Sequence, residues 1–155
     1  LTAANLTDAN LTDADLTAAN LTRANLTYAD LTDANLTDVL GASAPVIDNI
    51  DAKILAAIES PGCSLDMTDW HTCETTHCRA GWAVNLAGPA GKMLEDRIGP
   101  AAAGALIYAA SRPGEPIPNF YATNEDAMED LRECAFLQTN AAPQTSPNAP
   151  QGNQP

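Results

Sequence analysis

The chain has 155 residues, of which 20 are acidic and seven are basic, so its formal net charge is −13 at pH 7. This excess of acids argues against a nucleic-acid-binding protein, because binding to phosphates needs a surplus of Lys and Arg. It also disfavours binding to an anionic membrane surface, and no run of 18 apolar residues predicts a transmembrane helix. We therefore expect neither nucleic acid nor membrane as a partner and predict a cytoplasmic protein.

A five-residue repeat occupies residues 1–40. Leu recurs at every fifth position from Leu1 to Leu36, Thr follows each Leu, and Ala with Asn or Asp precedes each Leu from Leu6 onward. A period of five matches neither the 3.6-residue turn of a helix nor the two-residue alternation of a strand. A single inward column of Leu therefore requires a chain that turns a corner every five residues, which predicts a solenoid of stacked coils.

This unit, Ala-(Asn/Asp)-Leu-Thr-X, resembles the repeat of the pentapeptide-repeat family. The resemblance implies a right-handed quadrilateral β-helix of about two coils, in which four repeats form one coil and a small Ala packs inward beside each Leu. The implied repeat core consists of Leu6, Leu11, Leu16, Leu21, Leu26, Leu31 and Leu36, with Ala4, Ala9, Ala14, Ala19, Ala24, Ala29 and Ala34 beside them. Because the chain opens within a repeat, we expect the natural solenoid to continue toward its N-terminus.

The outward X positions of the repeat carry an acidic column, which consists of Asp8, Asp13, Asp33 and Asp38. Some pentapeptide-repeat proteins resemble duplex DNA in charge and girth and bind type II topoisomerases in its place. The resemblance therefore implies a protein partner that binds DNA, and a homodimer is left open as an assembly. The alternative is that Asp and Thr only solubilise the β surface and discourage edge aggregation. Arg23 and Tyr28 interrupt the column.

Residues 41–46 are predicted to be a connector and residues 47–137 a small all-α domain. Five apolar residues share one helical face near its start, namely Ile47, Ile50, Ile54, Leu55 and Ile58. Gly and Pro punctuation predicts further helices over 75–86, 91–98, 100–110 and 123–137. No alternating apolar run is long enough to predict a strand. Residues 138–155 hold four Pro and no charged side chain, which predicts a disordered tail.

Three of the four Cys, both His and both Trp lie between Cys63 and Trp82, which makes this segment the candidate site. Its Cys-x-x-x-x-Cys-x-Ala-Gly-Trp pattern resembles a domain of bacterial and phage proteins that is sometimes found beside pentapeptide repeats. That resemblance supports the domain boundary and implies no mechanism.

Metal binding is one interpretation of the segment, since zinc prefers tetrahedral Cys and His ligands. The candidate ligands are His71, Cys73, His77 and Cys78, and Cys63 is a substitute for one of them. Four ligands within eight residues is poor spacing for a structural zinc site, because such sites pair two short knuckles across a longer arm.

A reactive thiol is the second interpretation. Cys78 is predicted in the first turn of a helix, where unpaired amides favour a thiolate, with His77 or His71 as base. Arg79 would add positive charge, and Cys73 would act as a resolving partner. The third interpretation is structural, with buried cysteines and a Cys73–Cys78 disulfide in an oxidising compartment.

Taken together, the residues predict a non-enzymatic protein–protein interaction or scaffold protein with no assigned catalytic residue, metal or cofactor. The alternatives are a Cys-dependent enzyme or thiol redox protein that uses Cys78 and His77, and a small zinc site in residues 71–78.

Overall fold

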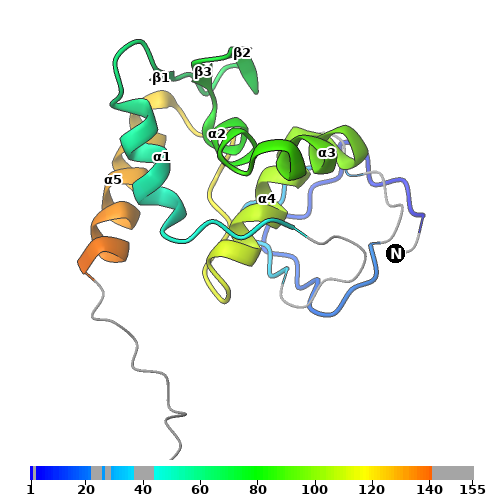
Figure 1. Ribbon diagram of the computed structural model, residues 1–155. Coiled ribbons are helices and arrows are strands. Elements are labelled where there is room, and N and C mark those ends of the chain that lie inside the picture. The colour runs from blue at the N-terminus through cyan, green and yellow to red at the C-terminus, as the bar shows by residue number, and fades with distance from the viewer. Residues whose placement is uncertain (2, 22–25, 27–28, 37–43, 141–155) are drawn as a thin grey trace, which may run out of the picture.

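The computed structural model describes residues 1, 3–21, 26, 29–36 and 44–140 (Figure 1). A repeat coil at the N-terminal end is followed by helices and a small sheet. The predictions for Asp38, Arg23, Tyr28, Ala24, residues 41–43 and the tail from residue 141 onward lie outside the described residues.

The repeat segment stacks on itself at a spacing of 20 residues. Parallel bridges join Asn10 to Asp30 and Asp15 to Asn35. Backbone hydrogen bonds run both ways across the stack, for example from Leu11 N to Asp30 O at 2.8 Å and from Asp30 N to Ala9 O at 3.0 Å. Twenty residues are four repeats, so four repeats form one coil of this β-helix.

Each position of the repeat has a defined hydrogen bond or backbone conformation in the coil. The Leu carbonyl accepts a hydrogen bond from the Ala three residues later, as in Ala14 N to Leu11 O at 3.0 Å. The X residue between them adopts a left-handed conformation, with φ of 58° at Asp13, as the third residue of a type II turn requires. The Asn or Asp before each Leu accepts from the Thr N–H two residues on, as Asn10 does from Thr12 at 3.0 Å.

The inward positions become more buried toward the helical part. The leucines at 16, 21, 26, 31 and 36 are buried, whereas Leu6 and Leu11 in the first coil are half-buried. Ala29 and Ala34 are likewise buried, because the second coil lies against the helices.

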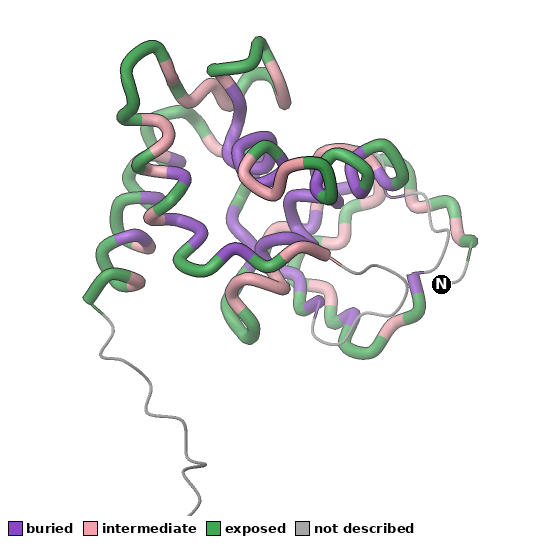
Figure 2. Tube along the Cα trace, in the orientation of Figure 1, coloured by how far each residue is buried: buried purple, intermediate pink, exposed green. Residues whose placement is uncertain are grey.

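The helices follow the predicted order. They are α1 (Ile50–Ile58), α2 (Arg79–Leu86), α3 (Gly88–Ile98), α4 (Pro100–Ser111) and α5 (Asn124–Asn140). The second helix begins four residues later than predicted, and the last helix continues through Asn140 into the segment predicted to be disordered. Helix α4 is buried on all sides from Ala101 to Tyr108, and α1 packs on α5 (Figure 2).

The prediction of an all-α domain is wrong in one place, because a three-stranded sheet precedes α2. Its strands are β1 (Ser64–Leu65), β2 (His71–Cys73) and β3 (Thr76–His77), in the order β1-β3-β2. Strand β3 is parallel to β1 and antiparallel to β2. Strands of two or three residues are too short to show an alternating pattern, so the sequence carries no strand signal here.

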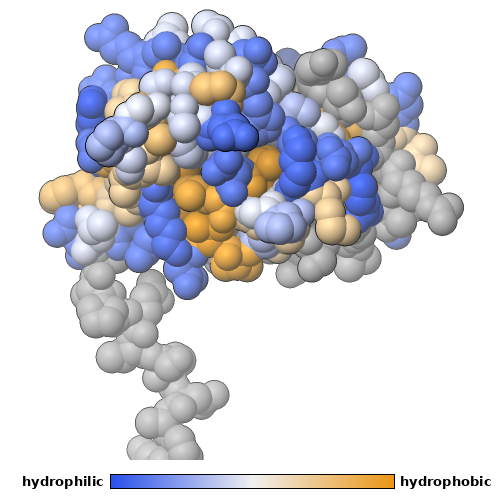
Figure 3. All heavy atoms as spheres, turned by 45° about the horizontal axis from the view of Figure 1, so that its top comes forward, coloured by the Kyte–Doolittle hydropathy of each residue, from blue (hydrophilic) through white to orange (hydrophobic). Residues whose placement is uncertain are grey.

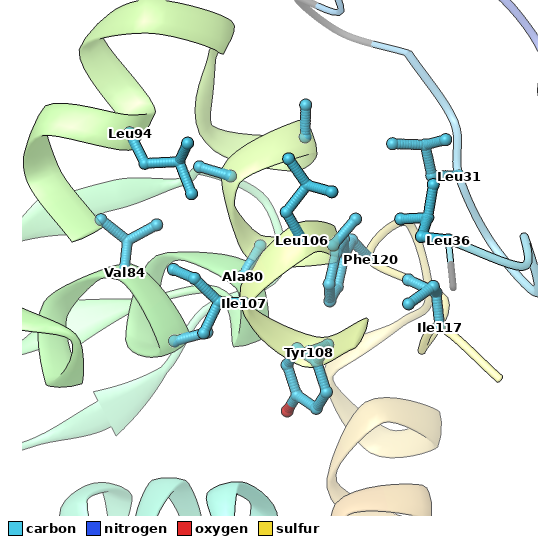
Figure 4. Close-up of a cluster of buried hydrophobic side chains, with 14 of the residues drawn as sticks. Leu31, Leu36, Ala80, Val84, Leu94, Leu106, Ile107, Tyr108, Ile117 and Phe120 are labelled. Atoms are coloured by element: carbon cyan, nitrogen blue, oxygen red, sulfur yellow. The ribbon is translucent and has the colours of Figure 1, made fainter. Parts of the chain in front are cut away.

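The coil and the helices share one hydrophobic core. Figure 4 shows Leu31 and Leu36 of the coil beside Ile117, Phe120 and Leu106. A backbone hydrogen bond from Asp33 N to Ile117 O, at 3.0 Å, joins the coil to the segment between α4 and α5. The coil is therefore fixed in orientation relative to the helical part.

Several large apolar side chains are exposed among the described residues. Val46, Met93, Phe136 and Leu137 are exposed, from several different elements. The face in Figure 3 is largely hydrophilic with an apolar area near its middle. Within the described residues, no helix has the length and apolarity needed to span a membrane.

Candidate functional site

Cys78 lies at the start of α2 and acts as its cap. Its Sγ accepts a hydrogen bond from Gly81 N at 3.3 Å, and the residue is 1% exposed. Burial raises the pKa of the Cys78 thiol to about 11. A buried, protonated thiol has the opposite properties from a nucleophile, which must be accessible and ionised. The role of Cys78 is therefore structural, as the N-cap of α2.

The two histidine rings of the segment lie against each other. His71 on β2 and His77 on β3 bring their Nδ1 atoms to 2.9 Å. The Nε2 of His77 lies 3.1 Å from the carbonyl oxygen of Glu74, and the His77 ring meets Trp82 edge-on at 4.7 Å between centroids. His77 is buried, and burial lowers its pKa below the ordinary value.

A carboxylate on α3, that of Glu95, forms a hydrogen bond with the His71 ring. Glu95 Oε1 lies 2.6 Å from Nε2 of His71, and Glu95 Oε2 accepts from Lys92 Nζ at 2.6 Å. Burial alone would raise the pKa of Glu95, but the hydrogen bonds from Lys92 and His71 hold it below its ordinary value. Sequence reasoning missed Glu95 and Lys92. The one local signal is a Lys and a Glu three residues apart on a predicted helix, which is common on surface helices.

A surface pocket of about 440 Å³ opens beside these rings. It is lined by His71, Cys73, Glu74, His77, Val84, Asn85, Gly88 and Lys92. Cys73 is exposed, and its Sγ lies 3.5 Å from Thr75 Oγ1. The hydrogen bond with Thr75 lowers the pKa of the Cys73 thiol to about 7. Of the two candidate thiols, Cys73 is therefore the one that is accessible and partly ionised near pH 7.

The predicted ligand set and disulfide are not brought together. Cys73 and Cys78 are free thiols. Across the described ranges, no group of three or more His, Cys, Asp or Glu side chains could hold a metal ion. Of the four candidate ligands, only His71 and His77 make direct side-chain contact with each other.

The structure predicts very different reactivities for the two cysteines. Alkylation of Cys73 by iodoacetamide should rise with pH to half its maximal rate near pH 7, because the thiolate is the reactive form. Cys78 should be modified only when the chain unfolds, because it is buried. Peptide mass spectrometry after timed alkylation checks both expectations.

The matched control is Cys73→Ser, which should remove the fast alkylation assigned to Cys73 and leave the alkylation of the remaining cysteines unchanged. Modification of Cys78 in the folded chain at the rate of Cys73 would contradict the assignment.

A second polar cluster lies between α1, α2, α4 and α5. Arg79 NH2 donates to Asp51 Oδ1 at 2.7 Å, Arg79 Nε donates to the Tyr108 hydroxyl at 2.8 Å, and Arg79 NH1 pairs with Asp130. Arg112 and Gln138 donate to Asp51 Oδ2 at 2.9 and 2.7 Å. The guanidinium of Arg79 is thus hydrogen-bonded within this network. Its role is structural and, contrary to the prediction from the sequence, it is not directed at the Cys78 thiol.

The acidic residues of the coil remain on its surface. Asp8, Asp13 and Asp33 are exposed and have φ values of 57–58°. Asp13 N donates to Thr32 O at 3.0 Å, so Asp13 and Asp33 lie on neighbouring coils at equivalent turns.

Comparison with known proteins identifies the N-terminal segment alone. Residues 1–38 match the family model for pentapeptide repeats, in eight copies. This confirms the predicted repeat. No curated protein and no solved structure matches the chain. The match ends before the helices, so the resemblance of residues 69–82 to a bacterial and phage domain stays a prediction.

Proposed function

Since its N-terminal segment is a pentapeptide-repeat coil, we propose that the protein is a non-enzymatic interaction module. Its acidic coil surface binds a basic, DNA-binding surface of a protein partner. The observation that carries the proposal is the placement of Asp8, Asp13 and Asp33, each exposed at the third position of its turn. Stacked coils are about 4.8 Å apart, so Asp13 and Asp33, which lie at equivalent turns, form a closely spaced pair of negative charges, and Asp8 adds a third charge at the preceding turn of the first coil.

The attachment of the coil to the helices supports this function. Leu31 and Leu36 belong to the common core, and the Asp33 backbone is bonded to Ile117. A surface that is already ordered loses little conformational entropy when a partner binds. The net charge of −13 adds a long-range attraction for basic partners.

The arrangement of the pocket favours binding over thiol catalysis. The Nε2 atoms of His71 and His77 are engaged by Glu95 and by the Glu74 carbonyl, and their Nδ1 atoms face each other. The Cys73 thiol forms a hydrogen bond with the Thr75 hydroxyl. The hydrogen bonds described for both imidazoles go to partners other than the Cys73 thiol, so neither ring is placed as its general base.

Removing the acidic charges should abolish binding to a basic DNA-binding surface. A triple variant, with Asp8→Asn, Asp13→Asn and Asp33→Asn, removes three charges and keeps residues that tolerate positive φ. We expect the parent chain at micromolar concentration to inhibit DNA supercoiling by a bacterial type II topoisomerase, and the triple variant to need at least about tenfold more protein. Gel analysis of plasmid topoisomers gives the measurement.

A second triple variant controls for net charge. Asp48→Asn, Glu59→Gln and Asp96→Asn remove three exposed charges from the helical part, and inhibition should persist. Raising the salt concentration should weaken inhibition by the parent chain, because exposed charges are screened. No inhibition by the parent chain, or equal loss in both triple variants, would refute the proposal.

A further inference from the structure

The hydrogen bonds around the two histidine rings determine where their protons lie. The Nε2 of His77 meets the carbonyl oxygen of Glu74, which can only accept, so this nitrogen carries a proton. The Nε2 of His71 meets Glu95 Oε1, and an ionised carboxylate also only accepts. Both rings therefore use their Nε2 atoms as donors.

A neutral imidazole carries one proton, so both Nδ1 atoms present lone pairs. These atoms face each other at 2.9 Å. Two lone pairs at that distance repel unless a cation lies between or beside them. The cation is either a third proton or a metal ion.

We infer that His71 and His77 form a chelating site for a divalent transition metal ion through their two Nδ1 atoms. The partners of the opposite nitrogens support this assignment. Imidazoles that bind metals almost always donate their other N–H to a carboxylate or a backbone carbonyl, which orients the ring. His71 has the first kind of partner and His77 the second.

The separation of the two nitrogens is short enough for both to bind one ion. With metal–nitrogen bonds of about 2.0–2.1 Å, atoms 2.9 Å apart subtend about 90° at the ion. A tetrahedral site would need a separation of about 3.3 Å at the same bond length. Right angles between ligands are typical of square-planar or octahedral Cu²⁺ and Ni²⁺. A chelate angle near 90° is therefore compatible with Cu²⁺ or Ni²⁺.

The pocket beside the rings supplies access and the remaining ligands. It has a volume of about 440 Å³ and is lined by both imidazoles, which leaves room for several water molecules. The described residues offer no third His, Cys, Asp or Glu in a ligating cluster, so water completes the coordination. The Glu95 carboxylate lies behind His71 and accepts hydrogen bonds from His71 and from Lys92, which fixes the orientation of the His71 ring.

Nickel titration of the untagged chain tests the site, because these are its only two histidines. Nickel is a suitable probe since free thiols do not reduce it. We expect one Ni²⁺ per chain in isothermal titration calorimetry, with a dissociation constant below about 0.1 mM. His71→Gln should weaken binding at least about tenfold. His71 is only half-buried, so this variant should stay folded, which its thermal unfolding curve checks.

Two variants of the same pocket are the matched controls. Cys73→Ser and Glu74→Gln remove the other potential ligands and leave the Glu74 carbonyl in place, so binding should persist in both. His77→Gln should also lose binding, provided that it stays folded. Failure of the parent chain to bind Ni²⁺ would assign the shared cation to a proton and overturn the inference. Binding that survives His71→Gln but is lost in Cys73→Ser would overturn it as well.

Discussion

Replacing Asp51 with alanine should lower the free energy of unfolding by about 3–5 kcal/mol, because the Arg79 guanidinium loses its one fully buried carboxylate partner and keeps only the exposed carboxylate of Asp130. Asp51 is 0% exposed and Arg79 is 1% exposed. The Asp51 carboxylate accepts hydrogen bonds from Arg79, Arg112, Tyr108 and Gln138. Urea unfolding followed by tryptophan fluorescence measures the change.

A peripheral ion pair of the same network is the control. Arg112 also lies 3.8 Å from Glu115, whose side chain is exposed. Solvent weakens such pairs, so Glu115→Ala should change the stability far less than Asp51→Ala. Replacing Asp51 and Arg79 together by Leu and Met should recover part of the loss, because the buried Arg79 charge is removed with its buried partner, while Arg112 and Asp130 each lose one partner. A small effect of Asp51→Ala alone would show that water reaches Arg79.

The repeat could be predicted from the sequence because its interactions are local. Each Leu-Thr-X-Ala segment forms the same kind of turn. The Asn or Asp side chain accepts a hydrogen bond from the backbone N–H of the Thr two residues later. The period of five therefore encodes both the corner and the inward column. The left-handed conformation of the X residues, seen at Asp8, Asp13, Ala18 and Asp33, could not be predicted from the period of five alone.

The helical part was predictable in outline only. Gly and Pro mark the helix ends well, and α4 begins at Pro100 as predicted. The short sheet was missed because β3 pairs with β1 across 12 residues, and pairing of that kind leaves no periodic signal. Residues 75–77, expected to be helical, form part of that pairing, and α2 starts after its Cys78 cap.

The candidate site shows the same limit. The concentration of Cys and His pointed to the right segment, but burial decides which cysteine reacts. Cys73 precedes β3 and is exposed, whereas Cys78 follows β3, five positions later, and is buried. The carboxylate that orients His71 comes from Glu95, 24 residues away. Sequence spacing cannot reveal a partner that only tertiary packing brings close.

Gly81→Ala should cost about 3 kcal/mol or more of folding stability, because the added methyl group has no space. A Cβ at this position would lie 2.1 Å from the Trp70 carbonyl oxygen, 3.1 Å from His77 Cβ and 3.2 Å from His71 Cε1. The closest atom belongs to the backbone, so α2 and the chain before β2 would have to separate. Chemical denaturation measures the loss.

Gly62→Ala is the matched comparison, since it separates steric overlap from backbone strain. Gly62 has φ of +83° and no atom within 4 Å of an added Cβ, so alanine there should cost only about 1–2 kcal/mol from the left-handed backbone. Gly81→Ala should also weaken Ni²⁺ binding, because the methyl group presses on both histidines, whereas Gly62→Ala should leave binding unchanged. Equal destabilisation by the two substitutions would mean that the contact between α2 and Trp70 is loose. In that case the close packing that positions the imidazole pair would be absent too.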